Sequence, residues 1–119
     1  MIALISSVPL ESEIIHASLN NPKKHVSGRK TMYQGSIHSQ SVVVMNCGIG
    51  KVNAAWAATV LCEKFPLTLL INHGVCGAYP ETELRIGDIA VAQKEMYGDE
   101  GVIEREGWYD LERIGIPVL

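Results

Sequence analysis

Short apolar runs that alternate with helical segments constrain this chain more than any other feature of its sequence. An uninterrupted apolar run predicts a strand buried on both faces, as in a parallel sheet. Between such runs, the alanine-rich segment 51–65 has a helical pattern and ends before Pro66, which cannot continue a helix. This alternation predicts an α/β fold with a mostly parallel central sheet and flanking helices. The predicted buried strands are Ile2–Ile5, Val42–Met45, Leu67–Asn72 and Asp88–Lys94.

The remaining segments fit between these strands. The stripe formed by Leu10, Ile14 and Ile15 predicts a helix over 10–19, which ends at Asn20-Asn21-Pro22. Residues 23–30 are polar and predict an exposed loop. Residues 32–37 and 41–45 predict a hairpin across His38-Ser39-Gln40. The chain has no internal repeat and no low-complexity linker, so it reads as one domain or a piece of one.

Composition excludes several classes of protein. Among the 119 residues, 47% are apolar, enough for a core, and the net charge of −3 offers no basic face for nucleic acid. No apolar run approaches the roughly 20 residues that span a bilayer, and no secretory leader is visible. Three widely spaced cysteines favour reduced thiols in a cytoplasmic protein. Because CxxC and HExxH spacings are absent, we predict no metal and no cofactor.

Three loops that follow apolar strands predict a single site. They are 6–11, 46–51 and 72–78. In open α/β sheets, ligands bind at the carboxyl ends of the strands. If the three strands are parallel neighbours, these loops converge at one edge of the sheet.

Glu11 is the candidate general base. It lies in the first turn of the predicted helix, where the positive end of the helix dipole favours a carboxylate. It can accept a proton from water if desolvation raises its pKa toward neutral pH. An acidic residue in a first helical turn is also an ordinary solvated cap, and the residues alone leave both roles open. Glu13 is the alternative base if the helix begins earlier.

The turn Ile71–Ala78 is built to approach a ligand. Backbone N–H groups on such a glycine-containing turn can hold an anion or a sugar hydroxyl. A phosphate site normally adds arginine, lysine or hydroxyl donors, whereas Val75 follows Gly74 here. The turn therefore predicts a ligand other than a phosphate dianion.

Four other features near the predicted site have ordinary explanations. Gly48-Ile49-Gly50 lacks the third glycine of a dinucleotide fingerprint, since position 53 is Asn53, and we interpret it as a tight strand-to-helix turn. Lys51 lacks phosphate-loop spacing and is expected to be solvated. Cys76 is more consistent with a small buried thiol than with a nucleophile. His73 either contacts a substrate or is a satisfied loop histidine.

Four segments, in their order and spacing, resemble the superfamily of purine nucleoside phosphorylases and nucleosidases. The resemblance covers almost the whole chain but only the N-terminal half of a family member. Within the superfamily, Val8-Pro9-Leu10-Glu11 and the tail 107–117 most resemble futalosine hydrolase, a nucleosidase of the alternative menaquinone route. Nucleosidases acting on methylthioadenosine usually have a methionine and an acidic run where this chain has Val8-Pro9-Leu10. The four segments are Ile2–Glu11, Cys47–Ala55, Gly74–Ala78 and Ile86–Ala92.

The resemblance implies roles for individual residues. Glu11 would activate the water that attacks the anomeric carbon of ribose. Phosphorylases tend to have arginines near positions 11 and 72, where this chain has Glu11 and Asn72, so water is favoured over phosphate. The segment after the fourth predicted strand would reach into a neighbouring subunit, which implies a homodimer or a higher homo-oligomer. Ile49 and Val102 would lie at the ribose 5′ substituent. The implied substrate-binding residues are Val8, Ile49, Val75, Cys76, Gly77 and Val102.

The sequence is therefore interpreted as the N-terminal part, residues 1–119, of a single nucleosidase domain with a truncated nucleoside phosphorylase-like fold. In the family, a methionine–glutamate pair that holds the ribose and an aspartate that protonates the leaving base lie in the second half, past Leu119. The predicted function is hydrolysis of the N-glycosidic bond of a nucleoside, best matched to futalosine hydrolase. The alternatives are a methylthioadenosine/adenosylhomocysteine nucleosidase and an inactive fragment that only binds a ligand or dimerises.

Overall fold

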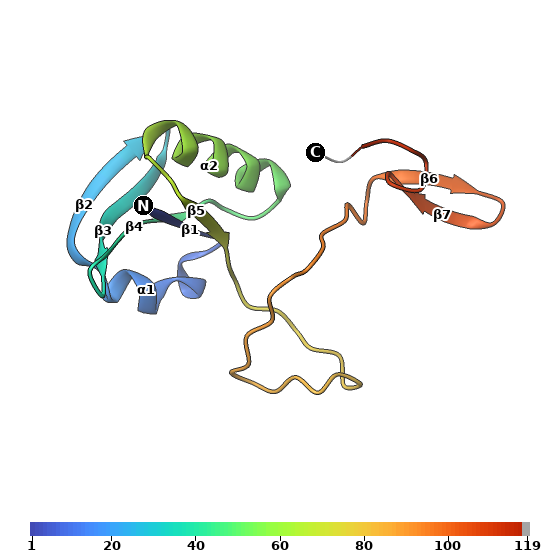
Figure 1. Ribbon diagram of the computed structural model, residues 1–119, viewed down its shortest axis with the longest axis horizontal. Coiled ribbons are helices and arrows are strands. Elements are labelled where there is room, and N and C mark those ends of the chain that lie inside the picture. The colour runs from blue at the N-terminus through green and yellow to red at the C-terminus, as the bar shows by residue number, and fades with distance from the viewer. Residues whose placement is uncertain (118–119) are drawn as a thin grey trace. The chain divides into compact units, whose positions relative to one another are not determined.

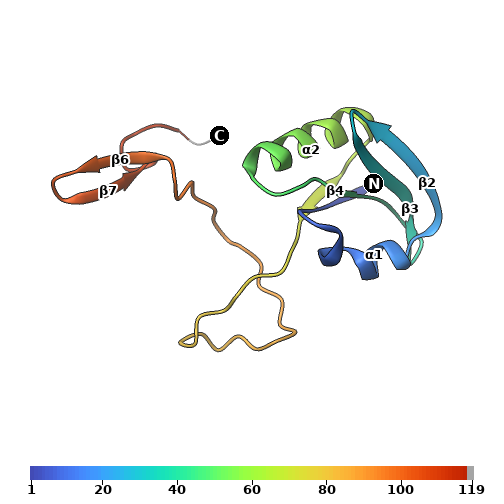
Figure 2. The same ribbon diagram turned by 180° about the vertical axis from the view of Figure 1, so that it is seen from behind.

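The computed structural model describes residues 1–117, which form two compact units, Met1–Gly77 and the residues from Ala78 onward. Figures 1 and 2 show the elements of each unit from two opposite sides. The second unit contains β6 (Gly101–Glu104) and β7 (Gly107–Asp110). The first unit contains β1 (Ile2–Ser6), the 3₁₀ turn η1 (Pro9–Glu11), α1 (Glu13–Ala17), β2 (Asn20–Ser27), β3 (Lys30–Ile37), β4 (Gln40–Asn46), α2 (Lys51–Lys64) and β5 (Leu69–Asn72).

The first unit has the predicted α/β architecture. Its five strands lie in the order β2-β3-β4-β1-β5, and β1 runs parallel to both β4 and β5. The strands β2, β3 and β4 pair antiparallel, so the sheet is mixed. The predicted hairpin is confirmed, and its turn places His38 and Ser39 at φ 46° and 66°. Two consecutive positive φ angles are typical of a type I′ turn, whose twist matches that of the flanking strands.

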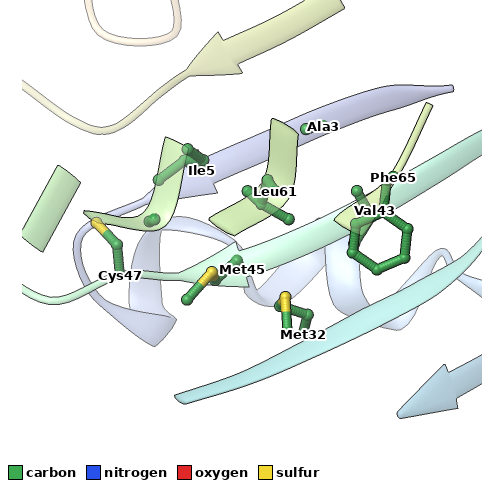
Figure 3. Close-up of a cluster of buried hydrophobic side chains, with 9 residues drawn as sticks. Ala3, Ile5, Met32, Val43, Met45, Cys47, Leu61 and Phe65 are labelled. Atoms are coloured by element: carbon green, nitrogen blue, oxygen red, sulfur yellow. The ribbon is translucent and has the colours of Figure 1, made fainter. Parts of the chain in front are cut away.

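Alternate residues of the central strands bury two separate cores. On one face, Ala3, Ile5, Val43 and Met45 pack against Leu61 of α2, as Figure 3 shows. On the other face, Val42 and Val44 pack with a second set of apolar residues that includes Leu19 and Ile15. Figures 1 and 2 show α2 and α1 on opposite sides of the sheet. The continuous apolar runs predicted strands buried on both faces, and β1 and β4 confirm this.

The N-terminal helix differs from the prediction. The segment 10–19 was expected to be one helix, but η1 ends at Glu11 and α1 covers only Glu13–Ala17. Ile14 is exposed, so the expected apolar stripe does not form one buried face. Pro9 begins η1, a position that suits proline, because no backbone N–H is needed in the first turn of a helix.

The polar segment 23–30 is also not a loop. Residues 20–27 form β2, which pairs antiparallel with β3 through Lys24 and Tyr33 and through Val26 and Thr31. Nearly all of β2 is exposed, because it lies at the edge of the sheet. Solvent-facing residues of an antiparallel edge strand need not be apolar, which is why the pattern suggested a loop.

The last two predicted buried strands are corrected as well. Strand β5 forms, but among residues 1–117 it pairs only with β1, and Leu69 and Ile71 are 49% and 39% exposed. The segment 88–94 is not a strand, and Ile89 and Val91 are exposed. A strand requires a backbone partner, and the described residues supply none for this segment.

In the second unit, β6 and β7 form a hairpin for which the sequence analysis predicted no strands. Val102 and Ile103 pair with Tyr109 and Trp108 across a turn that ends at Gly107, where φ is +128°. Only glycine adopts such a φ readily. The sequence signal was therefore present, as aromatic and β-branched residues on either side of a glycine turn.

Candidate functional site

The three loops expected to converge do so at the carboxyl ends of β4, β1 and β5. The N–H of Gly48 donates to the Ser7 carbonyl at 3.0 Å, which joins the loop after β4 to the loop after β1. On the other side, the N–H of His73 donates to the Ile5 carbonyl at 2.9 Å and extends the pairing of β5 with β1. Because β1 lies between two parallel partners, its carboxyl end brings both neighbouring loops beside it.

Glu11 lies at this junction. Its Oε2 accepts hydrogen bonds from the backbone N–H groups of Ser7 at 2.9 Å and Val8 at 3.1 Å. Its Oε1 accepts one from Val75 at 3.3 Å, across 64 positions of sequence. The carboxylate thus connects the loop after β1 to the glycine turn after β5. Backbone N–H donors to an ionised carboxylate are among the stronger hydrogen bonds in proteins.

These contacts set the ionisation of Glu11. The N–H groups of Val8 and Val75 hold its pKa below the ordinary value of 4.5, desolvation opposes them, and Ser7 and the charge of His73 add to the lowering. The sequence interpretation invoked a helix dipole and a pKa raised by burial, and both are corrected: Glu11 ends a 3₁₀ turn, and its pKa is lowered. Glu11 therefore carries a negative charge at neutral pH.

The lowered pKa links Glu11 to stability in acid. A carboxylate whose folded pKa lies below its unfolded value stabilises the folded state above the unfolded pKa. That contribution is lost as the pH falls through the folded pKa. The contribution of Glu11 to the stability of the folded state is small, because its carboxyl group is solvent-accessible.

Gly74 is required by the close approach of this carboxylate. A Cβ added at Gly74 would lie 2.7 Å from Glu11 Oε1, closer than atoms in contact can lie. The carboxylate is the flexible end of a side chain, so it would move while the fold remained intact.

We expect Gly74→Ala to displace Glu11 from the Val75 N–H and to raise the pKa of Glu11 toward 4.5. A ¹³C NMR titration of the Glu11 carboxyl measures this shift. Gly98→Ala is the matched control, since a Cβ there meets nothing within 4 Å. An unchanged pKa in Gly74→Ala would show that the Val75 contact does not hold the carboxylate.

A buried polar cluster lies beneath the same loop. The side-chain amide of Asn46, at the end of β4, donates to Ser6 Oγ at 2.7 Å and to Ser12 Oγ at 2.6 Å. A weaker contact of 3.3 Å runs from the same nitrogen to the Val8 carbonyl. Both serines are fully buried. Sequence reasoning missed this cluster, because serine and asparagine at these positions look like ordinary turn residues.

The other predicted site residues divide between the two units. Val8 adjoins Glu11, and Ile49 and Val75 lie on the converging loops with 76% and 79% of their surfaces exposed. Gly77 ends the glycine turn and is exposed. Cys76 was expected to be buried, but its side chain is exposed, because the turn runs over the surface. Val102 belongs to β6 in the second unit.

The surroundings of His73 differ from those of a satisfied loop histidine. Its Nε2 is buried and has no hydrogen-bond partner among residues 1–117. Its charge acts on Glu11, which places it among the groups that surround the carboxylate. Glu13, the alternative base, is exposed at the first residue of α1.

Residues 1–117 lack two features. No cluster of three or more histidine, cysteine, aspartate or glutamate side chains in this part of the chain has the arrangement of a metal site. Over the same residues, no helix combines the length and the apolar character needed to cross a membrane.

Comparison with known proteins decides the family. The model of the phosphorylase superfamily matches residues 1–112, nearly the whole chain. The chain belongs to the phosphorylase superfamily. This agrees with the resemblance seen in the sequence motifs and with the nucleoside phosphorylase-like arrangement of the first unit.

Relatives with curated names are nucleosidases. The 5'-methylthioadenosine/S-adenosylhomocysteine nucleosidase of Maridesulfovibrio salexigens is 40% identical over 98 residues, covering 82% of this chain and 42% of the relative. The enzyme of the same name from Listeria monocytogenes is 35% identical over 103 residues, covering 87% of this chain and 44% of the relative. The chain thus spans less than half the length of these relatives. They carry the name of the alternative weighed above and not that of futalosine hydrolase.

Solved structures agree with these relatives. The nucleosidase from Colwellia psychrerythraea in complex with adenine matches with a TM-score of 0.68 and 30% identity, over 73% of this chain and 36% of that chain. The enzyme from S. pneumoniae with a transition-state inhibitor matches with a TM-score of 0.64 and 35% identity, over 67% and 35% of the two chains. The predicted fold class is confirmed.

Proposed function

We propose that residues 1–119 are the N-terminal part of a single nucleosidase domain, in which Glu11 activates water for hydrolysis of an N-glycosidic bond. The observation that carries this proposal is the position of Glu11. Its ionised carboxylate is held by three backbone N–H groups where the loops after β1 and β5 meet. A carboxylate that is ionised and fixed in this way has the charge state and the position to accept a proton from a bound water.

The chemistry follows from this arrangement. As the water oxygen attacks the anomeric carbon, Glu11 accepts one water proton and the carbon–nitrogen bond breaks through an oxocarbenium-like state. The bonding electron pair leaves with the nucleobase, which takes up a proton from an acid. The family resemblance assigns that acid to an aspartate past Leu119. Residues 1–119 thus supply the base, and we propose that the remainder of the domain supplies the acid and the ribose clamp.

For the substrate, we favour methylthioadenosine or adenosylhomocysteine. This rests on the names of the relatives, which are up to 40% identical to this chain. Futalosine is the second candidate, because Val8-Pro9-Leu10 replaces the methionine and acidic run that usually precede the glutamate in methylthioadenosine nucleosidases. Assays of a full-length form with methylthioadenosine, adenosylhomocysteine, futalosine and inosine separate these substrates. Turnover of none of them would contradict the proposed function.

The remaining site residues keep the roles that the resemblance implies. Val8, Val75, Cys76 and Gly77 would contact the nucleoside, and Ile49 would face its 5′ substituent. Val102 would reach the 5′ substituent in the site of a second subunit, so we propose a cytoplasmic homodimer that needs no cofactor.

We expect cleavage by a full-length form to proceed without phosphate. The glycine turn 72–78 contains no arginine or lysine, and an acidic group lies beside the expected position of the nucleophile. A phosphate dianion would be repelled by Glu11 and would find no arginine or lysine donor in this turn. Rates measured in phosphate-free buffer and with added phosphate should be equal, with free ribose derivative as product. Strict phosphate dependence with a ribose 1-phosphate product would identify a phosphorylase instead.

A further inference from the structure

We propose that Asn46 is a positioning residue for the Glu11 carboxylate and acts through the backbone of the loop after β1. Asn46 does not contact Glu11 itself. It lies at the last residue of β4, opposite Ser6 in the parallel register of β1 and β4. This inference rests on the proposed function of Glu11 and adds a residue outside the set that the sequence motifs suggested.

The geometry begins with the amide nitrogen of Asn46. It has two hydrogens, and its two short contacts lead to Ser6 Oγ at 2.7 Å and Ser12 Oγ at 2.6 Å. Ser6 precedes and Ser12 follows the segment 7–11 that contains Glu11. One side chain therefore fixes both ends of this segment.

The direction of the hydrogen bonds supports the same arrangement. The Ser12 hydroxyl donates to the Pro9 carbonyl at 3.3 Å, so its oxygen is free to accept from the Asn46 amide. Both serines are fully buried, so water cannot replace a lost partner without entering the fold. A buried polar group left without a partner is costly, which makes this cluster rigid when it is complete.

The segment held in this way supplies the donors to Glu11. The N–H groups of Ser7 and Val8 bind Oε2, and Asn46 also approaches the Val8 carbonyl at 3.3 Å. If the loop relaxed, these two donors would move away from the carboxylate. The charge of His73 also acts on Glu11. The backbone N–H of His73 donates to the Ile5 carbonyl of β1, so His73 is held independently of Asn46.

The first experiment titrates the Glu11 carboxyl by ¹³C NMR in the 119-residue chain. In Asn46→Ala, we expect the pKa of Glu11 to rise toward 4.5, because the Ser7 and Val8 donors are no longer held. Ser12→Ala removes a single acceptor and should shift the pKa in the same direction by less. Asn20→Ala is the matched control: it removes an amide that donates to the Ser36 carbonyl, far from the site, and should leave the pKa unchanged. If Asn46→Ala does not fold, Ser12→Ala alone decides the result.

The second experiment measures kinetics of a full-length form. We expect Asn46→Ala to lower kcat about tenfold or more with little change in KM, since positioning of a general base affects the chemical step. The acid limb of the pH profile should move to higher pH along with the pKa of Glu11. A wild-type pKa for Glu11 in both folded variants would overturn the inference. Absence of nucleosidase activity in the wild-type protein would overturn the proposed function, while the titration would still test the positioning of Glu11.

Discussion

Replacement of Glu11 by glutamine is expected to lower kcat of a full-length form by about a hundredfold or more, the usual scale for loss of a general base. Glutamine keeps the shape of the side chain, and its carbonyl oxygen can still accept from the N–H groups of Ser7 and Val8. Its amide nitrogen would face the Val75 N–H and cannot accept a proton from water. KM should therefore change much less than kcat.

Glu13→Gln is the control for this experiment. Glu13 lies two positions along the chain and is exposed, so its replacement should leave turnover near the wild-type value. The pH profile gives a second check: because the pKa of Glu11 is lowered, the acid limb of kcat/KM should lie below pH 4.5 and should be absent in Glu11→Gln. If Glu13→Gln lost activity and Glu11→Gln did not, the general base would be Glu13.

The central strands could be predicted from sequence because both of their faces are buried. Continuous apolar runs at 2–5 and 42–45 match β1 and β4, and the alanine-rich segment matches α2. The edges of the sheet could not be predicted in the same way. Strand β2 needs no apolar residues on its exposed side, and β5 is apolar but half open to solvent. The segment 88–94 shows that apolar character does not make a strand without a backbone partner.

The candidate site, like the sheet, could be predicted only in part from the sequence. Glu11 could be singled out as a candidate because it follows a buried strand and matches the family motif. Its full environment could not be predicted, because part of it depends on contacts distant in sequence. The Val75 N–H comes from 64 positions away, and Asn46 is 40 positions from Ser6. No local pattern specifies such contacts. The sequence interpretation considered desolvation, which raises the pKa of Glu11, and left out the N–H groups of Val8, Val75 and Ser7, which lower it. Cys76 illustrates the same limit: its residue type favours burial, but the turn that carries it lies on the surface.

The 119-residue chain by itself is expected to associate and to turn over nucleosides at the background rate. Strand β5 pairs with β1 on one side only, so the N–H and C=O groups of its other edge have no strand partner among residues 1–117. Exposed side chains of Leu69 and Ile71 lie on the same strand. An unpaired apolar edge is a template for pairing with another chain. Size-exclusion chromatography with light scattering should therefore report a dimer or a larger species.

Turnover is expected to fail for a separate reason. The relatives are more than twice as long as the segment that this chain matches, which covers 42% and 44% of them. If the family resemblance assigns the acid correctly, the isolated chain holds the base without the acid, and the leaving base must depart as an anion. Loss of positioned proton transfer costs about 10²–10⁴-fold, and loss of the ribose clamp adds to this. Ile71→Lys should reduce association by placing a charge on the edge strand, without restoring turnover. A monomeric 119-residue chain with full activity would mean that the acid lies within these residues, and the search for it would begin with His73, whose buried Nε2 has no partner.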